Sequence, residues 1–391
     1  FTFYQFFSMC SDSDSNVQNI PTDAIENYCN GMTLNDFENL DQSKIEVLNV
    51  EIKNSKDFYQ DLVNGYRVGN FINDRYKKKY FSNIQIEFKN GLSCQFESEV
   101  RIHGDLKDHI KINEKISSLD VKLLNGNILG FTHFKLFLPN TRNFENEIFT
   151  ATLLEELGVI SPKTFYVNVN FNGFHTSQFI FQEKVKKELI ERYGFREGPI
   201  IETNENYLWQ NTEDKYVRNI SIIDDWHLLY AGLLNQNWVQ RSDSNYKIAY
   251  YAMGLYNRSL YSSDSSYLLN IDSEGFDNSY NYRYEAIMMA LYANDNSNFI
   301  NHATINHNRK FYYNPITNIF HPIYYDGMIR IYDNKLLDPK NLNPRINQSI
   351  IDEAKKLFSE EFDEEIFYEK LLLNGISSNK TQVREIIKKF K

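Results

Sequence analysis

Residues 301–331 read NHATINHNRKFYYNPITNIFHPIYYDGMIRI, and this stretch predicts a strand, a turn and a second strand. The two strands are expected at 309–313 and 319–325, where aromatic and branched residues predominate. The arms of a hairpin are hydrogen-bonded neighbours, so the start of one lies beside the end of the other. We therefore expect Asn308 and Asp326 to lie close together in space.

The polar residues at this strand end predict a candidate metal site. A carboxylate and an amide oxygen beside the imidazoles of His302 and His307 can hold a hard cation and the phosphate that it carries. The alternative is a surface hairpin whose polar ends contact water, and the stretch alone does not decide between the two. The spacing of the two histidines does not match a zinc-binding helix.

The composition limits the classes of function. A chain of 391 residues can form one large domain or two lobes. Its net charge of −10 makes it a poor candidate for non-specific nucleic-acid binding, which needs a basic surface. Three cysteines are too few for a disulfide framework, and no CxxC pair indicates zinc. No apolar run is long enough to predict a membrane-spanning helix.

The first ten residues, FTFYQFFSMC, are apolar up to Cys10 and precede the polar tract SDSDSN. This pattern is typical of the end of a signal peptide with Cys10 at a lipoprotein-type cleavage site, although Met9 suits such a site poorly. The alternative is a frayed N-terminus. The first interpretation predicts an extracytoplasmic or envelope-associated protein, and the second is compatible with the cytoplasm.

The pattern along the chain predicts three parts: a polar tail at 1–40, a β-rich lobe at 41–205, and a C-terminal lobe at 206–391 with hairpin 309–325 and terminal helices. Strands are predicted at 45–52, 84–88, 93–102, 119–124, 134–138, 165–171 and 174–181. Helices are predicted at 58–64, 144–157, 185–192, 224–235, 283–293, 348–358, 364–373 and 381–390, with a polar insertion at 255–282. Strands followed by helices indicate an α+β protein, with two lobes and a cleft between them.

Cationic residues on predicted strands are candidate phosphate ligands. Arg101 ends a strand just before Gly104, where a glycine allows close approach of the backbone. Lys122 and Lys135 lie within strands, as does the phosphate-binding lysine of many phosphotransferases. Lysines on the solvent face of a sheet are the common alternative. We favour Lys122, because it shares a strand face with Asp120.

Two glutamates have structural and functional interpretations. Glu147 lies in the first turn of the predicted helix 144–157, where an acidic residue favours the helix dipole, yet it could also pair with a lysine of the sheet. Glu183 ends a strand near the predicted lobe boundary, where it is either a helix-capping partner or a residue of the cleft.

The motifs exclude several familiar enzyme classes. The chain has no Gly-x-Ser-x-Gly elbow, no P-loop, no glycine-rich kinase loop and no HRD triplet, so serine hydrolases, Walker-type proteins and standard protein kinases are excluded. Six segments nevertheless follow one another in a familiar order: RIHGD (101–105), SLDVKL (118–123), LLEELG (153–158), FYVNVNFNGF (165–174), FIFQEK (179–184) and HNRKFYYNPITNIFHPIYYDG (307–327). In this order they resemble the CotH family of atypical, secreted or spore-coat protein kinases, over roughly residues 95–330.

The resemblance implies an atypical protein-kinase-like fold with two lobes, an antiparallel-sheet N-lobe and a mainly helical C-lobe that carries the metal-site hairpin. It implies ATP and Mg²⁺ in a cleft between the lobes, and transfer of phosphate to a Ser/Thr hydroxyl of a protein at the spore coat or cell envelope.

By position in the motifs, Asp326 is similar to the metal-binding aspartate and Asn308 to the second metal ligand of kinases. Lys122, Arg101 and Glu183 are the residues expected to bind the nucleotide, with the role of Glu183 the least defined.

One departure concerns the catalytic base. Kinases place an aspartate five residues before the metal-binding asparagine, and that position here is Ala303. His302 could substitute as the base, or Asp295 could reach in from the preceding loop. The alternative is a pseudokinase, that is, a nucleotide-binding or interaction module of the cell envelope without phosphate transfer. A third, weaker alternative is a structural surface protein.

Overall fold

The computed structural model describes residues 29–30, 40–69, 71–204, 207, 228–262, 269–293, 302–331, 348–388 and 390. Both predicted lobes are represented, whereas Asp295, Cys10, most of the tail at 1–40 and residues 205–206 at the predicted boundary between the lobes lie outside the described residues.

Seven strands of the N-terminal part close into a β-barrel. They pair in the order β4-β3-β2-β9-β10-β8-β7, and β7 pairs with β4 to complete the ring. All neighbours are antiparallel except β2 and β9, which pair in parallel. The bounds are β2 Ile45–Ile52, β3 Tyr80–Phe88, β4 Ser93–Ile102, β7 Leu119–Leu123, β8 His133–Phe137, β9 Thr164–Phe171 and β10 His175–Glu183.

The barrel forms because its strands alternate apolar and polar residues. In β3 and β4, every second side chain is buried and the intervening ones are more exposed. The buried set fills the barrel interior with residues such as Leu48, Ile84, Val121, Phe134 and Phe181. The other set lies on the outer wall, and on β7 and β8 that wall carries charged side chains.

A second sheet of four strands contains the hairpin. Its order is β12-β11-β13-β14, with bounds β11 Ile200–Asn204, β12 Tyr230–Leu233, β13 Lys310–Asn314 and β14 Ile319–Ile323. The predicted hairpin is thereby confirmed, with Lys310 paired to Ile323 and Asn314 paired to Ile319. A parallel bridge from Ile160 to Ile323 joins β14 to the segment that leads into β9.

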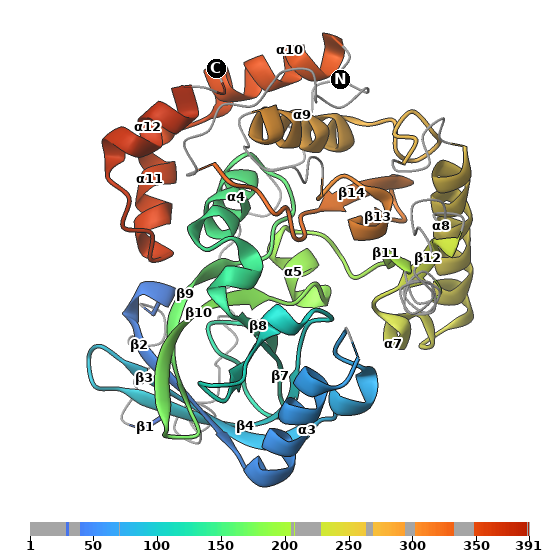
Figure 1. Ribbon diagram of the computed structural model, residues 1–391. Coiled ribbons are helices and arrows are strands. Elements are labelled where there is room, and N and C mark those ends of the chain that lie inside the picture. Colours follow the sequence, from blue (N-terminus) through green and yellow to red (C-terminus); the bar gives the residue numbers. More distant parts are fainter. Residues whose placement is uncertain are drawn as a thin grey trace, which may run out of the picture.

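The helices pack around these two sheets (Figure 1). Helix α4 contacts β9 on the barrel and α11 among the C-terminal helices. Helix α8 packs against β12, and α9 packs against β14. The helical bounds are α3 Ser55–Arg67, α4 Glu145–Glu156, α5 Lys187–Arg192, α7 Gln236–Val239, α8 Asp243–Tyr261, α9 Ser279–Ala293, α10 Gln348–Lys356, α11 Glu364–Leu373 and α12 Lys380–Lys388.

The prediction of a two-lobed kinase-like fold with an antiparallel-sheet N-lobe and a mainly helical C-lobe is wrong. The N-terminal sheet closes into a mixed barrel, and the C-terminal part contains strands of a second sheet as well as helices. The closing contacts join segments far apart in the sequence, such as β2 with β9, and local sequence patterns do not encode such pairings.

Two predictions about local structure are also wrong. Within the predicted helix 224–235, residues 230–233 form the strand β12, because they pair with β11. The predicted polar insertion at 255–282 is partly helical, since α8 continues to Tyr261 and α9 begins at Ser279. Helix α8 is stabilised by the buried residues Ala249, Ala252, Leu255 and Tyr256 on one face.

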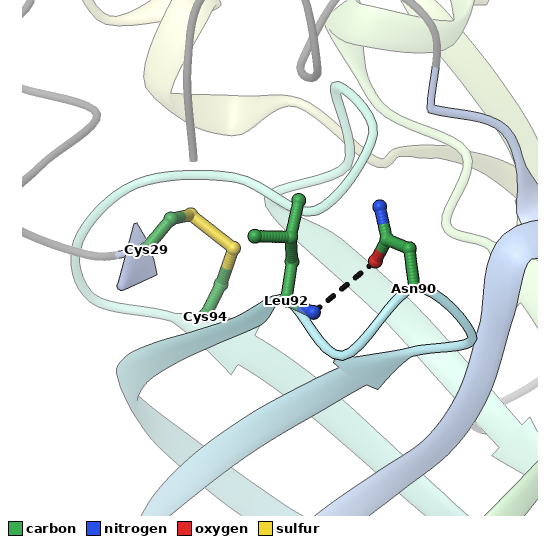
Figure 2. Close-up of a disulfide and its surroundings, with 4 residues drawn as sticks. All are labelled: Cys29, Asn90, Leu92 and Cys94. Atoms are coloured by element: carbon green, nitrogen blue, oxygen red, sulfur yellow. Dashed lines mark hydrogen bonds between the residues drawn. A yellow bond between two sulfur atoms is a disulfide. The ribbon is translucent and has the colours of Figure 1, made fainter. Parts of the chain in front are cut away.

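A disulfide bond connects Cys29 to Cys94 (Figure 2). Cys29 belongs to the short strand β1, Cys29–Asn30, which pairs with β4 at this point. The bond therefore fixes the segment before the barrel to the start of β4. Nearby, the side chain of Asn90 accepts a hydrogen bond from the Leu92 amide at 3.1 Å and closes the turn before β4.

Within the described parts of the chain, every helix is too short or too polar to cross a membrane.

Reduction of the Cys29–Cys94 bond is expected to lower the free energy of unfolding. The bond closes a loop with a sequence separation of 65, and restricting such a loop in the unfolded state stabilises a protein by about 4 kcal/mol. Urea unfolding with and without dithiothreitol measures the difference. Cys10→Ser should keep the full effect of the reductant, whereas Cys29→Ser should abolish it. Equal stability of wild type with and without the reductant would contradict the prediction.

Candidate functional site

Asp326 lies just beyond β14 and is the centre of a buried polar cluster. Its Oδ2 lies 3.2 Å from Nη1 of Arg142 and 3.8 Å from Nε2 of His302. Its Oδ1 is buried and has no hydrogen-bond partner. Burial alone would raise the pKa of this carboxyl. The opposing effects of Arg142 and then His302 are larger, so the pKa of Asp326 lies well below its usual range. Asp326 is therefore a carboxylate with one oxygen available to a ligand.

Arg142 enters the cluster from the turn that connects β8 to α4. Its guanidinium lies 4.0 Å from the centre of the Phe137 ring and donates to the Thr141 carbonyl at 2.9 Å. Its Nε is buried without a partner. A planar guanidinium with a free N–H and a nearby carboxylate is suited to bind an oxyanion.

A chain of hydrogen bonds holds the loop that carries Asp326. Gln182 on β10 donates to Glu147 on α4 at 3.0 Å, and the hydroxyl of Tyr324 donates to the same carboxyl at 2.7 Å. The Tyr324 hydroxyl in turn accepts from the Gly327 amide at 3.1 Å. Burial and then Asp326 raise the pKa of Glu147. The network thus connects the barrel, α4 and the residues on both sides of Asp326.

The backbone of this region is strained. Asp326 and Met328 have φ of 45° and 50°, and Asn143 and Phe144 before α4 have φ of 51° and 55°. The side chain of Asn143 donates to the Ile329 carbonyl at 3.4 Å, so the two strained segments are in contact. Positive φ at non-glycine residues is uncommon and concentrates at functional sites.

Lys135 projects from the outer wall of β8 toward the same region. Its Nζ lies 3.5 Å from the Tyr325 hydroxyl and 5.0 Å from the centre of the Tyr325 ring. Burial lowers the pKa of Lys135 to about 7, against the attraction of Asp120. Lys310 lies over the same Tyr325 ring at 4.3 Å and forms an ion pair with Glu202. Lys135 is consequently a buried amine whose protonated, charged form a bound anion would stabilise.

Asp120 lies opposite Lys135 on the neighbouring strand β7. Lys184, just after β10, is 2.6 Å from its carboxylate, and Arg101 on β4 is 3.7 Å away. These contacts lower the pKa of Asp120, although burial alone would raise it.

The RIHGD segment forms the remaining wall. The ring of His103 lies 5.2 Å from that of Phe137, and Nδ1 of His109 is hydrogen-bonded to the Ser118 hydroxyl at 3.0 Å. Burial, then Arg142, lowers the pKa of His109 to about 3. Gly104 has φ of 98°, and a Cβ there would lie 2.1 Å from the His109 ring, so this position requires glycine.

The structure brings together some of the residues expected from the sequence. His302 lies beside Asp326, and the Asn308 amide donates to the His302 carbonyl at 3.1 Å, so the three belong to one cluster. Arg101 reaches the edge of this cluster through Asp120.

Other expected residues lie apart from Asp326. Lys122 lies on β7, two residues beyond the Asp120–Lys135 pair, where it faces His133 of β8. Glu183 points away from Gln182 and forms an ion pair with Arg192 at 2.5 Å, while it accepts from the Lys163 amide. Burial raises the pKa of Glu183 despite Arg192. His307 is half-buried, and desolvation and then His302 lower its pKa to about 4.

Sequence reasoning placed Lys122 ahead of Lys135 and gave Arg142 no role, although both Lys135 and Arg142 lie near Asp326. Both were visible as cations near predicted element ends, but alternation along a strand does not reveal how deeply a lysine is buried. The signal that favours Lys135 is Phe137, which lies two residues later on the same face of the strand. An apolar residue on this outer face indicates that the barrel wall is covered there, and α4 and Arg142 cover it in the structure.

One surface groove lies away from this cluster. A groove of about 550 Å³ lies elsewhere on the barrel wall and is lined by residues that include Lys53, Phe81, Ser82 and Leu124. We place the candidate site at Asp326 because that region combines an unpartnered carboxylate oxygen, buried cations and strained backbone, which the groove lacks.

Comparisons with known proteins do not assign the chain to a family. No protein-family model matches the sequence, and a search of curated proteins finds no match. The resemblance to the CotH family therefore stays a prediction from the motifs.

Gly327→Ala is expected to lower the free energy of unfolding by about 1–3 kcal/mol. An added Cβ would lie 2.7 Å from the Tyr324 hydroxyl and would displace it from Glu147 and from the 327 amide. Gly254→Ala is the matched control, because that helical glycine has no heavy atom within 4 Å of an added Cβ; it should stabilise by about 0.5–1 kcal/mol. Urea unfolding measures both. If Gly327→Ala destabilises a Tyr324→Phe protein less than it destabilises the wild type, the effect depends on the Tyr324 hydroxyl. Equal destabilisation of both proteins would contradict this explanation.

Lys135→Met is expected to change how stability depends on pH. The pKa of Lys135 is about 7 in the folded protein and has its ordinary value of 10.5 in the unfolded chain, so the unfolded state binds more protons between these values. The wild type should therefore gain about 1.4 kcal/mol per pH unit relative to the variant from pH 7 upward. Urea unfolding at pH 7, 8 and 9 measures this difference, with Lys89→Met, an exposed barrel lysine, as control. A constant difference between wild type and Lys135→Met would show that the lysine titrates normally.

Proposed function

We propose that the chain binds ATP with Mg²⁺ at the cluster around Asp326 and transfers the terminal phosphate to a hydroxyl group of a protein or another surface molecule. The observation that carries this proposal is the buried Oδ1 of Asp326, which has no hydrogen-bond partner while Arg142 and His302 hold Oδ2. A carboxylate positioned by an arginine and open on one side is suited to bind a metal-phosphate complex.

The residues present fit Mg²⁺ better than a metal that needs a complete protein cage. Within the described residues, no group of three or more His, Cys, Asp or Glu side chains could hold a metal ion. Magnesium usually binds through one or two carboxylates, waters and the substrate phosphates. Asp326 would supply the carboxylate and Asn308 the second oxygen, since its amide nitrogen is engaged by the His302 carbonyl. When bound, Mg²⁺ would neutralise charge that develops on the transferred phosphoryl group.

The side chains of the cluster have distinct roles in the proposed transfer. Lys135 and Arg142 bind and orient the phosphate oxygens. The acceptor oxygen attacks the terminal phosphorus, the bond to the bridging oxygen breaks, and ADP leaves with that bonding electron pair. His302 accepts the proton of the acceptor hydroxyl, because it is the partly exposed base beside Asp326.

The second candidate is nucleotide binding without transfer, and Ala303 favours it. The Ala303 amide donates to the Tyr292 hydroxyl at 2.7 Å, and its carbonyl accepts from Tyr284 at 3.0 Å. This residue is buried in the core, so its position supplies backbone contacts and no carboxylate. With His302 as the base, transfer is expected to be slower than with a positioned aspartate.

The Cys29–Cys94 disulfide supports an extracytoplasmic location for this activity. Disulfides form and persist mainly in oxidising compartments, such as the cell surface. A surface location agrees with the envelope or spore-coat role implied by the motif resemblance.

Asp326→Asn and Lys135→Met are expected to abolish the rise in melting temperature that ATP with Mg²⁺ produces in the wild type, because each removes a charge that holds the complex. Differential scanning fluorimetry measures this shift, and Lys89→Met should retain it. Transfer of radiolabelled phosphate from ATP to a generic protein acceptor distinguishes the two candidates. His302→Ala should lower transfer at least tenfold and leave the melting shift in place.

The absence of any melting shift with ATP and Mg²⁺ would refute both candidates. A shift without phosphate transfer in wild type would leave nucleotide binding as the function. Transfer that survives Asp326→Asn would place the chemistry elsewhere in the molecule.

A further inference from the structure

A second group of cations lies on the barrel wall beyond Lys135. We call this group the outer row; its members are Lys122, Lys184 and Lys186. Lys122 on β7 faces His133 on β8, two residues beyond the pair formed by Asp120 and Lys135. Two residues of a strand span about 7 Å, and residues of the same parity share a face. Lys184 follows β10 directly, and its amide donates to the His133 carbonyl at 3.2 Å. The outer row is therefore next to the Asp326 cluster but distinct from it.

The outer row carries more positive charge than its neighbours neutralise. Across the part of the chain that the structure describes, Lys184 pairs with Asp120, while neither Lys122 nor Lys186 has an ion-pair partner. Glu99, which lies opposite Lys122 on β4, is engaged by Lys79 at 3.2 Å. This excess is local, since the whole chain has a net charge of −10.

The titration of nearby groups reflects the same crowding. Burial, then Lys186 and Lys184, lowers the pKa of His133 to about 4. Burial, then Lys184, lowers the pKa of Lys186, although Asp120 and Glu188 act in the opposite direction. Positive side chains gathered around His133 that Asp120 and Glu188 neutralise only in part favour a bound anion.

Asp120 separates the two cationic groups. Its carboxylate lies between Lys135 on one side and Lys184 on the other, with Arg101 3.7 Å away. A single linear polyanion that reached from Asp326 to Lys122 would have to pass this negative charge. Two anions, one on each side of Asp120, avoid that repulsion.

We propose that Lys122, Lys184 and Lys186 form a second anion subsite, which binds a phosphate or carboxylate group of the hydroxyl acceptor while the nucleotide occupies the Asp326 cluster. The acceptor is then an acidic or already phosphorylated peptide segment. The assignment to an acceptor rests on the proposed phosphotransferase function, whereas the anion subsite itself does not.

Isothermal titration with inorganic pyrophosphate tests the subsite in protein saturated with ATP and Mg²⁺. Lys122→Met/Lys186→Met should weaken pyrophosphate binding at least tenfold and change the affinity for ATP less than twofold. Neither side chain has an ion-pair partner within the described residues, so the substitutions remove charge without leaving a carboxylate unpaired. Lys122→Arg/Lys186→Arg should restore binding, which separates loss of charge from loss of folding.

Displacement of ATP by pyrophosphate, or loss of ATP affinity in the double methionine variant, would show one continuous site and overturn the proposal. If wild type does not bind ATP, the proposed function fails, and the same titration is made without nucleotide. Weaker pyrophosphate binding by the double variant would then still support the subsite, and unchanged binding would refute it.

Discussion

The buried ion pair between Arg142 and Asp326 is the constraint on which the site depends. Arg142 is buried and Asp326 is largely enclosed, so each charge would be costly alone and the elements that carry them must meet in one arrangement. Arg142 comes from the turn between β8 and α4, and Asp326 comes from the end of the hairpin. The pair therefore links the barrel to the second sheet, and the Glu147–Tyr324 hydrogen bond fixes the same connection from α4.

Closure of the barrel explains why the cationic side chains face this junction. In a closed ring the inward positions are mostly apolar, so Asp120 and Lys122 of β7 and Lys135 of β8, whose neighbours along the strand face inward, are directed to the outer wall. Where α4 and the hairpin cover that wall, Lys135 is buried and its pKa falls. Where the wall is open, lysines such as Lys122 stay partly exposed. The outer wall of the barrel thus carries both a buried lysine, on β8, and a partly exposed lysine, on β7.

Local patterns in the sequence predicted the barrel strands and the hairpin well, missed β11 and β12, and did not predict how the strands assemble. The bounds of β2 and β4, and the hairpin with its paired ends, followed from alternation and turn residues. Ring closure did not follow, because the parallel pairing of β2 with β9 depends on distant segments. For the site, the hairpin predicted that Asn308 and Asp326 lie close together; in the structure His302 lies beside Asp326, and Asn308 is hydrogen-bonded to the His302 backbone. The choice of Lys122 over Lys135 rested on a shared face, and burial by α4 cannot be read from a face alone.

The left-handed backbone at Asp326 limits how this position can evolve. Only glycine, asparagine and aspartate adopt a φ of 45° with little strain, whereas the longer glutamate side chain gains no local hydrogen bond there. A lineage that gave up the charge could therefore do so through asparagine without disturbing the loop. Under the proposed function, proteins of this fold with and without the metal-binding carboxylate would differ by one tolerated substitution at this position.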